Sequence, residues 1–230
     1  MRGYGEFEDF PQIMFAILGG DFPIVVDTGA PDPDFVRRHH RYDYVRAEDE
    51  HPVDALRAIG VEVEDVPMVI NTHLHWDHCG NNVLFVNAEF IVQQSELHFA
   101  IDPIRQARLA YENTAEMLPP WAPVLNRFRT VRGDVGLTAE ISLVTLPGHS
   151  PGSQGVLVDT DAGRFLLAGD CVDSYANWAG DDRLPHIPGG VFIDMVDYME
   201  SFDKIEGLER QGVQIIPSHD QRVLDTGVFG

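Results

Sequence analysis

The chain has few positive charges and no long apolar run. Of its 230 residues only 16 are Lys or Arg, against 37 Asp or Glu, and Lys204 is the only lysine. The formal net charge of -21 creates a field that repels phosphate backbones, so a nucleic-acid partner is disfavoured and neutral or cationic small molecules fit better. No stretch approaches the roughly 18 to 20 apolar residues of a membrane span. We therefore expect neither a nucleic-acid nor a membrane partner.

Cysteine is also scarce, with Cys79 and Cys171 as the only two. The opening Met1 to Glu6 lacks a basic start followed by an apolar core, so we expect no secretory signal. Both thiols should then be reduced, and we expect small buried residues, with a redox-sensitive role as the alternative. Because 44% of the residues are apolar, the chain can bury one substantial core. These observations predict a single cytoplasmic domain over residues 1–230.

The most informative stretch is Thr72-His73-Leu74-His75-Trp76-Asp77-His78, which has the pattern HxHxDH and follows an apolar segment. Residues two apart in an extended loop project to the same side, so His73, His75 and Asp77 can face one another, while His78 needs a turn. Imidazole and carboxylate ligands together suit zinc, with iron, manganese or cobalt still open. The stretch predicts half of a two-metal site.

Three further residues of ligand type, His149, Asp170 and His219, each follow an apolar segment that is typical of a strand. Taken singly, each is better explained as a core histidine or a helix-capping aspartate. Their joint occurrence beside Gly or Pro favours a dinuclear site, in which Asp170 would be the natural bridge between two cations.

This ordered set resembles the metallo-β-lactamase superfamily over nearly the whole chain. The segments Asp27-Thr28-Gly29, 72–82 and 146–154 resemble most the N-acyl homoserine lactonase group within it. Compared with that group the chain begins late, and we expect one N-terminal strand to be missing.

The resemblance implies two metal ions, most simply two Zn²⁺. By the superfamily pattern, the first metal is held by His73, His75 and His149, the second by Asp77, His78 and His219, and both by Asp170. A hydroxide bridging the two ions would attack the ester carbonyl, and Asp77 would relay the proton to the departing alkoxide. Tyr175, five residues after Asp170, is the nearest candidate for the family tyrosine that binds the lactone carbonyl. Thr72, Ser218 and Asp220 are candidates to orient the imidazoles.

Apolar segments and helical segments alternate in two successive blocks. The expected strands are 13–18, 24–26, 66–70, 89–92, 128–131, 141–146, 155–158, 165–168 and 213–216. The expected helices are 52–59, about 195–208, and one from Pro103 towards Met117 with Asp102 as its cap. Two apolar sheets flanked by helices imply an α/β fold, a four-layer αββα sandwich with loops at one edge. The segments near 97–128 and 175–192 are candidate lids.

We therefore predict a dinuclear zinc hydrolase that opens lactone rings, a quorum-quenching activity, on small lactone or ester substrates, with a homodimer as one option for assembly. A thioesterase of the glyoxalase II type would use the same seven ligands, but its anionic substrates call for Lys or Arg, which are scarce here. A β-lactamase fits less well, because those relatives lack the bridging aspartate and are exported. A non-catalytic metal-binding or redox module, the alternative from a different class, is disfavoured by the complete ligand set.

Overall fold

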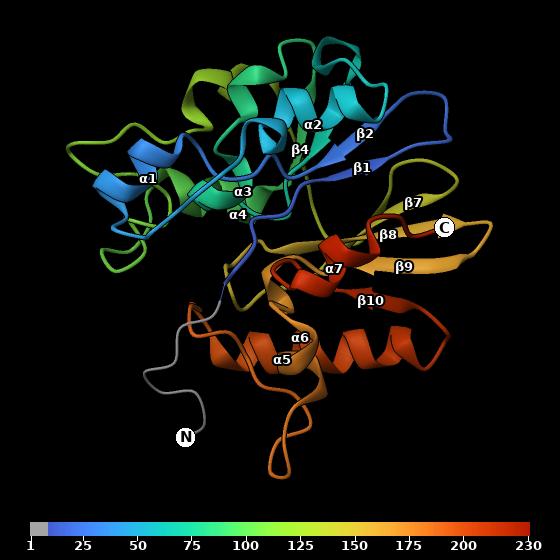
Figure 1. The fold of residues 1–230 in the computed structure, drawn as a ribbon. Coiled ribbons are helices and arrows are strands. Elements are labelled where there is room, and N and C mark those ends of the chain that lie inside the picture. Colours follow the sequence, from blue (N-terminus) through green and yellow to red (C-terminus); the bar gives the residue numbers. More distant parts are fainter. Residues whose placement is uncertain (1–8) are drawn as a thin grey trace.

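In the computed structural model, which describes residues 9–230, two five-stranded sheets pack face to face between helices (Figure 1). Going down Figure 1, the layers are helices, the first sheet, the second sheet and a long helix. The predicted four-layer α/β sandwich is confirmed. The expectation of no secretory signal concerns Met1 to Glu6, which lie outside the described residues. Among the described residues, no helix is long and apolar enough to cross a membrane.

The first sheet contains its strands in chain order: β1 (Phe15–Ile17), β2 (Ile24–Val26), β3 (Met68–Ile70), β4 (Glu89–Gln93) and β5 (Phe128–Val131). β1 and β2, both expected as strands, form an antiparallel hairpin, and β2 to β5 run parallel. Because parallel strands end at the same edge of a sheet, the residues that follow β2 and β3 lie side by side. The backbone N–H of Asp27 accordingly donates to the carbonyl of Ile70 at 2.9 Å.

The second sheet has the order β10-β9-β8-β7-β6 and is mainly antiparallel. Its strands are β6 (Val135–Gly136), β7 (Ile141–Thr145), β8 (Gln154–Thr160), β9 (Gly163–Leu167) and β10 (Gln214–Ile216). β10 runs parallel to β9, which places the segments following both strands at one edge. His149, Asp170 and His219 follow β7, β9 and β10 respectively, as the sequence predicts.

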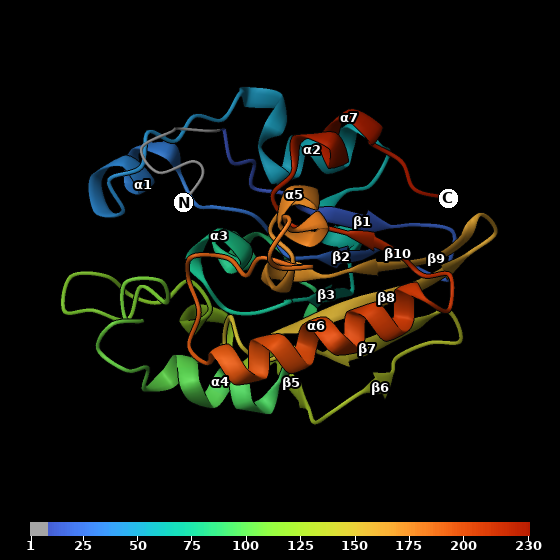
Figure 2. The same ribbon diagram turned by 90° about the horizontal axis from the view of Figure 1, so that it is seen from below.

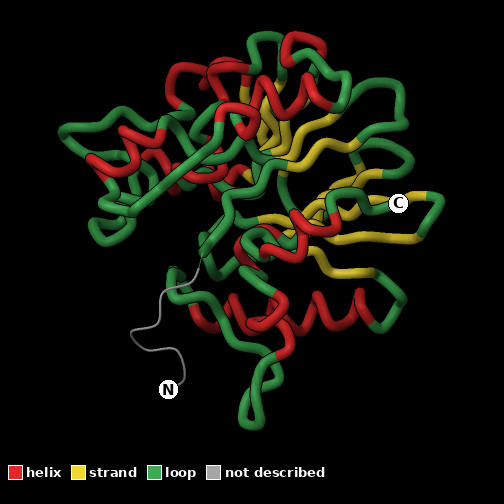
Figure 3. The backbone as a smooth tube through the Cα atoms, viewed as in Figure 1, coloured by secondary structure: helices red, strands yellow, loops and turns green. Residues whose placement is uncertain are grey.

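Helices cover the outer faces of both sheets (Figure 3). The α-helices are α1 (Pro33–His39), α2 (Pro52–Ala58), α3 (Trp76–Cys79), α4 (Gln94–Ile101), α5 (Tyr175–Ala179), α6 (Met195–Glu209) and α7 (Gln221–Thr226). Of these, α7 contributes Val223 to the core between the sheets. The long helix α6 lies across the outer face of the second sheet (Figure 2), and the Asp194 side chain caps its first turn. α2 and α6 confirm two of the predicted helices.

The core is divided by the layers. One cluster fills the space between the sheets and includes Ile70, Ile91 and Leu143, while a second packs the other face of the β7–β10 sheet against Tyr198 and Phe202 of α6. Two further clusters pack the first sheet against its helices and loops. The extent of a single domain over 1–230, and the lid roles of 97–128 and 175–192, stay predictions.

The predicted helix from Pro103 towards Met117 is wrong. The helix of this region is α4, which ends before it, and Asp102 terminates α4 with φ -138° and ψ 69° instead of capping a new helix. The amide of Asn113 donates to the carbonyls of Ala100 and Ile101, so a later residue satisfies the end of α4. Residues 102–121 form turns held by such contacts, including one from Trp76 N–H to the Ala110 carbonyl.

We expect Leu143→Ala to lower the free energy of unfolding by about 2–5 kcal/mol, because Leu143 is fully buried between the two sheets and truncation leaves a cavity. Urea denaturation of the chelator-treated protein would measure the loss. Leu118→Ala is the matched control, since Leu118 is 70% exposed. Equal losses in the two variants would contradict the assignment of the inter-sheet core.

Candidate metal centre

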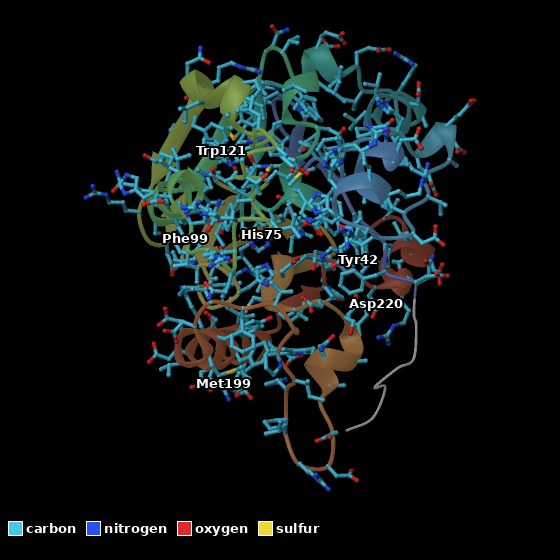
Figure 4. The ribbon with its side chains drawn as sticks, turned by 90° about the vertical axis from the view of Figure 1, so that its left-hand side faces the viewer. Tyr42, His75, Phe99, Trp121, Met199 and Asp220 are labelled. Carbon is cyan, nitrogen blue, oxygen red and sulfur yellow. The ribbon has the colours of Figure 1, made fainter. Side chains whose placement is uncertain are left out.

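The HxHxDH segment follows β3, at the edge of the first sheet where its parallel strands end. His73 and His75 lie in the extended segment after β3, and the short helix α3 then turns the chain so that Asp77 and His78 face the same region. Figure 4, which looks at the left-hand side of Figure 1, shows His75 near the middle of the molecule, between the upper helices and α6. Six of the seven candidate ligands, all except Asp77, are between 0% and 7% exposed.

Three imidazoles converge at one point. His149 Nε2 lies 3.2 Å from His73 Nε2 and 3.0 Å from His75 Nδ1. A neutral imidazole has one N–H and one lone pair, so three ring nitrogens facing each other can be satisfied by a shared cation that accepts all three lone pairs. These nitrogens therefore have the arrangement that a metal ion requires.

Asp170 lies between this group and a second one. Its Oδ1 is 3.0 Å from both His78 Nε2 and His219 Nε2, whereas its Oδ2 is 3.4 Å from His149 Nε2 and 3.8 Å from His73 Nε2. Each carboxylate oxygen thus faces a different set of imidazoles. Asp77 completes the second set, with Oδ2 at 3.8 Å from His78 Nε2.

A buried, unpaired nitrogen tests whether a metal fits. His78 Nε2 points at Asp170 but has no hydrogen bond of acceptable geometry among the described residues, and a buried polar atom without a partner is costly. Three overlapping groups have ligand atoms within 4.8 Å of one another: His73, His75 and His149; His73, His78 and Asp170; Asp77, His78 and His219. The donor set fits divalent ions of borderline softness.

The opposite ring nitrogens are held by the surrounding backbone and by Asp27. His149 Nδ1 is 2.8 Å from the Val191 carbonyl, and His219 Nδ1 is 2.8 Å from the Pro11 carbonyl. His78 Nδ1 lies 2.8 Å from Asp27 Oδ2. Each contact favours a proton on Nδ1 and leaves Nε2 free as a ligand.

Of the three candidates for orienting the imidazoles, Thr72 contacts a ligand ring in the structure. Thr72 Oγ1 lies 3.1 Å from His73 Nδ1, as expected. Ser218 Oγ is buried without a hydrogen-bond partner in the described part of the chain, and Asp220 instead caps α7 and pairs with Arg222. Asp27 is a supporting residue that the sequence did not indicate, because it carries no ligand pattern of its own and stands out only as part of the Asp27-Thr28-Gly29 segment.

Electrostatics divide the ligands into two kinds. Burial lowers the pKa of His73 and His75 well below the usual value, so both are neutral and ready to donate a lone pair. Burial also acts against the charged form of His78, but the carboxylates of Asp170, Asp77 and Asp27 outweigh it and raise its pKa. For Asp170, burial is likewise outweighed by the neighbouring imidazoles, which lower its pKa well below the usual value. The centre therefore attracts positive charge around Asp170.

Tyr175 occupies the first turn of α5, where its ring lies 4.4 Å from the Arg222 guanidinium carbon and packs against the core between the sheets. Its catalytic role stays a prediction. Asp173, which the sequence analysis missed, lies closer to the ligands: its carbonyl accepts the His219 backbone N–H at 2.9 Å. Burial and the nearby Asp170 raise the pKa of Asp173 to about 6.

Both cysteines are free and buried, as expected, and their role stays a prediction. Cys79 Sγ contacts the Leu74 carbonyl at 3.4 Å. Burial raises the pKa of both thiols, and a thiol held in its neutral form is a poor nucleophile and a poor redox sensor.

Residues 9–215 match the family described as the Metallo-beta-lactamase superfamily, and the chain belongs to it. Relatives there include N-acyl homoserine lactonases, in agreement with the resemblance of the segments 27–29, 72–82 and 146–154. The lactonase AttM of Azorhizobium caulinodans is 33% identical over 236 residues, covering 95% of this chain and 85% of that protein. A lactonase of a Bacillus species is 30% identical over 192 residues, covering 79% and 71%.

The fold agrees with solved structures. A Bacillus thuringiensis AiiA variant with N-decanoyl-L-homoserine bound at its active site superimposes with a TM-score of 0.73 at 23% identity, covering 94% of this chain and 84% of that one. At this identity the likeness shows the shared fold.

We expect Asp27→Asn to weaken metal binding about 10- to 100-fold. One carboxylate accepts from Thr72 N–H, Thr72 O–H and His78, whereas an amide replaces one acceptor by a donor. Asn tolerates the left-handed φ of 57° at this position, so the backbone should be kept. Titration against a competing chelator would measure the affinity, with the exposed Asp21→Asn as control. An affinity equal to that of the control would refute the role of Asp27.

Proposed function

We propose that this protein is a metal-dependent hydrolase that opens the ring of N-acyl homoserine lactones or closely related esters, a quorum-quenching activity. The observation that carries the proposal is the position of Asp170, whose two oxygens face different histidine groups 3.0 to 3.8 Å away. A shared carboxylate of this kind is what a two-metal hydrolase requires. The lactonase relatives support the same activity.

The seven predicted ligands would hold the two ions in the arrangement expected from the sequence, with zinc as the proposed metal and iron, manganese or cobalt as alternatives. Bound there, two divalent ions would acidify water and polarise a substrate carbonyl. A solved dizinc lactonase of the same fold, AidC, supports zinc.

The chain's own residues would orient the substrate and move its proton. Asp77 is the most exposed of the seven, with 14% of its side chain accessible, so its carboxylate can take a proton from the attacking water and return it to the departing alkoxide oxygen. Tyr175 remains the proposed hydrogen-bond donor to the carbonyl oxygen. Its ring would have to reach the substrate from beneath Arg222.

An apolar rim beside His149 suits an acyl chain. Val191, whose carbonyl contacts His149 Nδ1, is 57% exposed, and the following Phe192 is 41% exposed. Exposed apolar side chains next to a buried polar centre favour a substrate that has an apolar tail and a polar reacting group.

The thioesterase alternative is less well supported because its anionic substrates need cationic partners. Lys204 is occupied by Asp134 at 2.7 Å and by the Thr145 carbonyl at 2.9 Å. Asp173 adds a further carboxylate beside the ligands. Both observations favour a neutral lactone. The two reduced cysteines support a cytoplasmic location, and a homodimer stays a prediction.

The proposal is tested by supplying a panel of lactones to protein whose metal content has been counted. We expect ring opening of acyl homoserine lactones, detected as acid release with a pH indicator, at about two metals per chain. Thioesters and aromatic lactones complete the panel. Turnover of thioesters without turnover of lactones would reject the lactonase assignment and favour the alternative.

We expect Asp170→Asn to lose one metal per chain and most of the activity, because an amide provides a single oxygen ligand and cannot bridge two cations. Metal content after gel filtration and lactone turnover would both be measured. Asp161→Asn, on the exposed turn between β8 and β9, is a matched control. Two retained metals and full activity in Asp170→Asn would eliminate the bridging role.

A further inference from the structure

Glu96, on α4, is a fully buried carboxylate that is not one of the seven candidate ligands. Four donors surround it. Its Oε1 accepts from the Leu74 backbone N–H at 2.9 Å and from the Tyr111 hydroxyl at 2.8 Å. Its Oε2 accepts from the Ser150 hydroxyl at 2.5 Å and from the Gly152 backbone N–H at 3.2 Å.

Three of these four donors, Leu74, Ser150 and Gly152, belong to the two loops that supply the first group of histidines. Leu74 stands between His73 and His75, and Ser150 directly follows His149. The two loops come from different sheets, and Glu96 is separated from its partners by 22 residues on one side and 54 on the other. One carboxylate therefore joins the backbone of both loops.

A close approach of the main chain makes this geometry rigid. A Cβ placed on Gly152 would meet the Glu96 backbone nitrogen at 2.2 Å and Cα at 2.5 Å, so only glycine allows the loop to lie against α4. Ser150 Oγ also lies 2.8 Å from Ser153 Oγ, which fixes the hydroxyl from a second side.

Tyr111 connects the same carboxylate to His75. Its ring is fully buried, and its centroid lies 4.6 Å from that of His75 with an edge-on angle of 76°. The hydroxyl that donates to Glu96 thus holds a ring that limits how His75 can rotate. Through Leu74, Tyr111 and Ser150, Glu96 is thus linked to all three histidines of the first group without touching any of them.

We propose that Glu96 is the positioning residue of the first metal site, and that it sets the separation between His73, His75 and His149. The inference rests on the proposed metal site. It deepens that proposal, because a single buried carboxylate would position the ligands of the first metal and not those of the second. All four of its acceptor positions are used by donors, so only a carboxylate satisfies them together.

The test is Glu96→Gln, which keeps the size of the side chain but replaces one acceptor oxygen by an NH₂ donor. Cobalt(II) affinity is measured by chelator competition in two backgrounds. In His219→Ala the second site lacks a ligand, so binding reports the first site; in His149→Ala binding reports the second. We expect Glu96→Gln to weaken the first site about 10- to 100-fold and to leave the second unchanged.

Tyr111→Phe removes one of the four donors and serves as a second variant, for which we expect a smaller, first-site-selective loss. Glu116→Gln is the matched control, because Glu116 is exposed on the segment after α4. Thermal unfolding of the metal-free proteins separates positioning from general stability. If Glu96→Gln does not fold, Tyr111→Phe decides.

The outcomes distinguish this proposal from the proposed function. A protein with native Glu96 that binds fewer than two cobalt ions would contradict the metal site itself. Two sites with an unchanged first-site affinity in Glu96→Gln, or in Tyr111→Phe where only that variant folds, would overturn the role of Glu96. Equal weakening of both sites, with a matching loss of thermal stability, would also overturn it, because Glu96 would then act on the whole fold.

Discussion

The candidate metal centre depends on the contact between one buried carboxylate, Asp170, and imidazoles from both sheets. Asp170 follows β9 of the second sheet, yet its Oδ1 lies 3.0 Å from Nε2 of His78, which follows the first sheet, and 3.0 Å from Nε2 of His219. Neither sheet holds a complete metal site alone, since the HxHxDH segment comes from one and the three later ligands from the other. The face-to-face packing of the apolar core therefore also sets the geometry of the centre.

Two buried carboxylates divide the support of this centre. Asp27 accepts from the backbone N–H of Thr72 and contacts the ring of His78. Glu96 accepts from the backbone N–H groups of Leu74 and Gly152, which lie in the two loops that carry the first histidine group. Buried carboxylates are stable only when several donors surround them, and both have three or more. Each therefore holds backbone that carries candidate ligands, and Asp27 reaches both groups, because Thr72 contacts His73 while Asp27 itself contacts His78.

The sequence predicted the sheets and the convergence of the seven residues because both follow from local patterns: apolar segments form strands, and ligand residues placed directly after them gather at the sheet edges. The supporting residues could not be found this way. Asp27 and Glu96 act through backbone contacts 45 and 56 residues away, and nothing in their neighbouring sequence indicates such partners. The error at 103–117 has the same origin, because Asn113 satisfies the end of α4 through a contact that the local pattern does not contain.

The residues that follow Asp170 set the local charge beside the candidate centre. The Arg222 guanidinium lies over the ring of Tyr175. Asp220 accepts from the Tyr175 backbone N–H and pairs with Arg222, so these two charged residues hold the tyrosine in place. Asp173, two residues earlier, provides a carboxylate nearer to the histidines. A polar group that is neutral or positive meets less repulsion there than an anionic one. In a chain with a net charge of -21, this local charge and the overall field act in the same direction, towards substrates without negative charge.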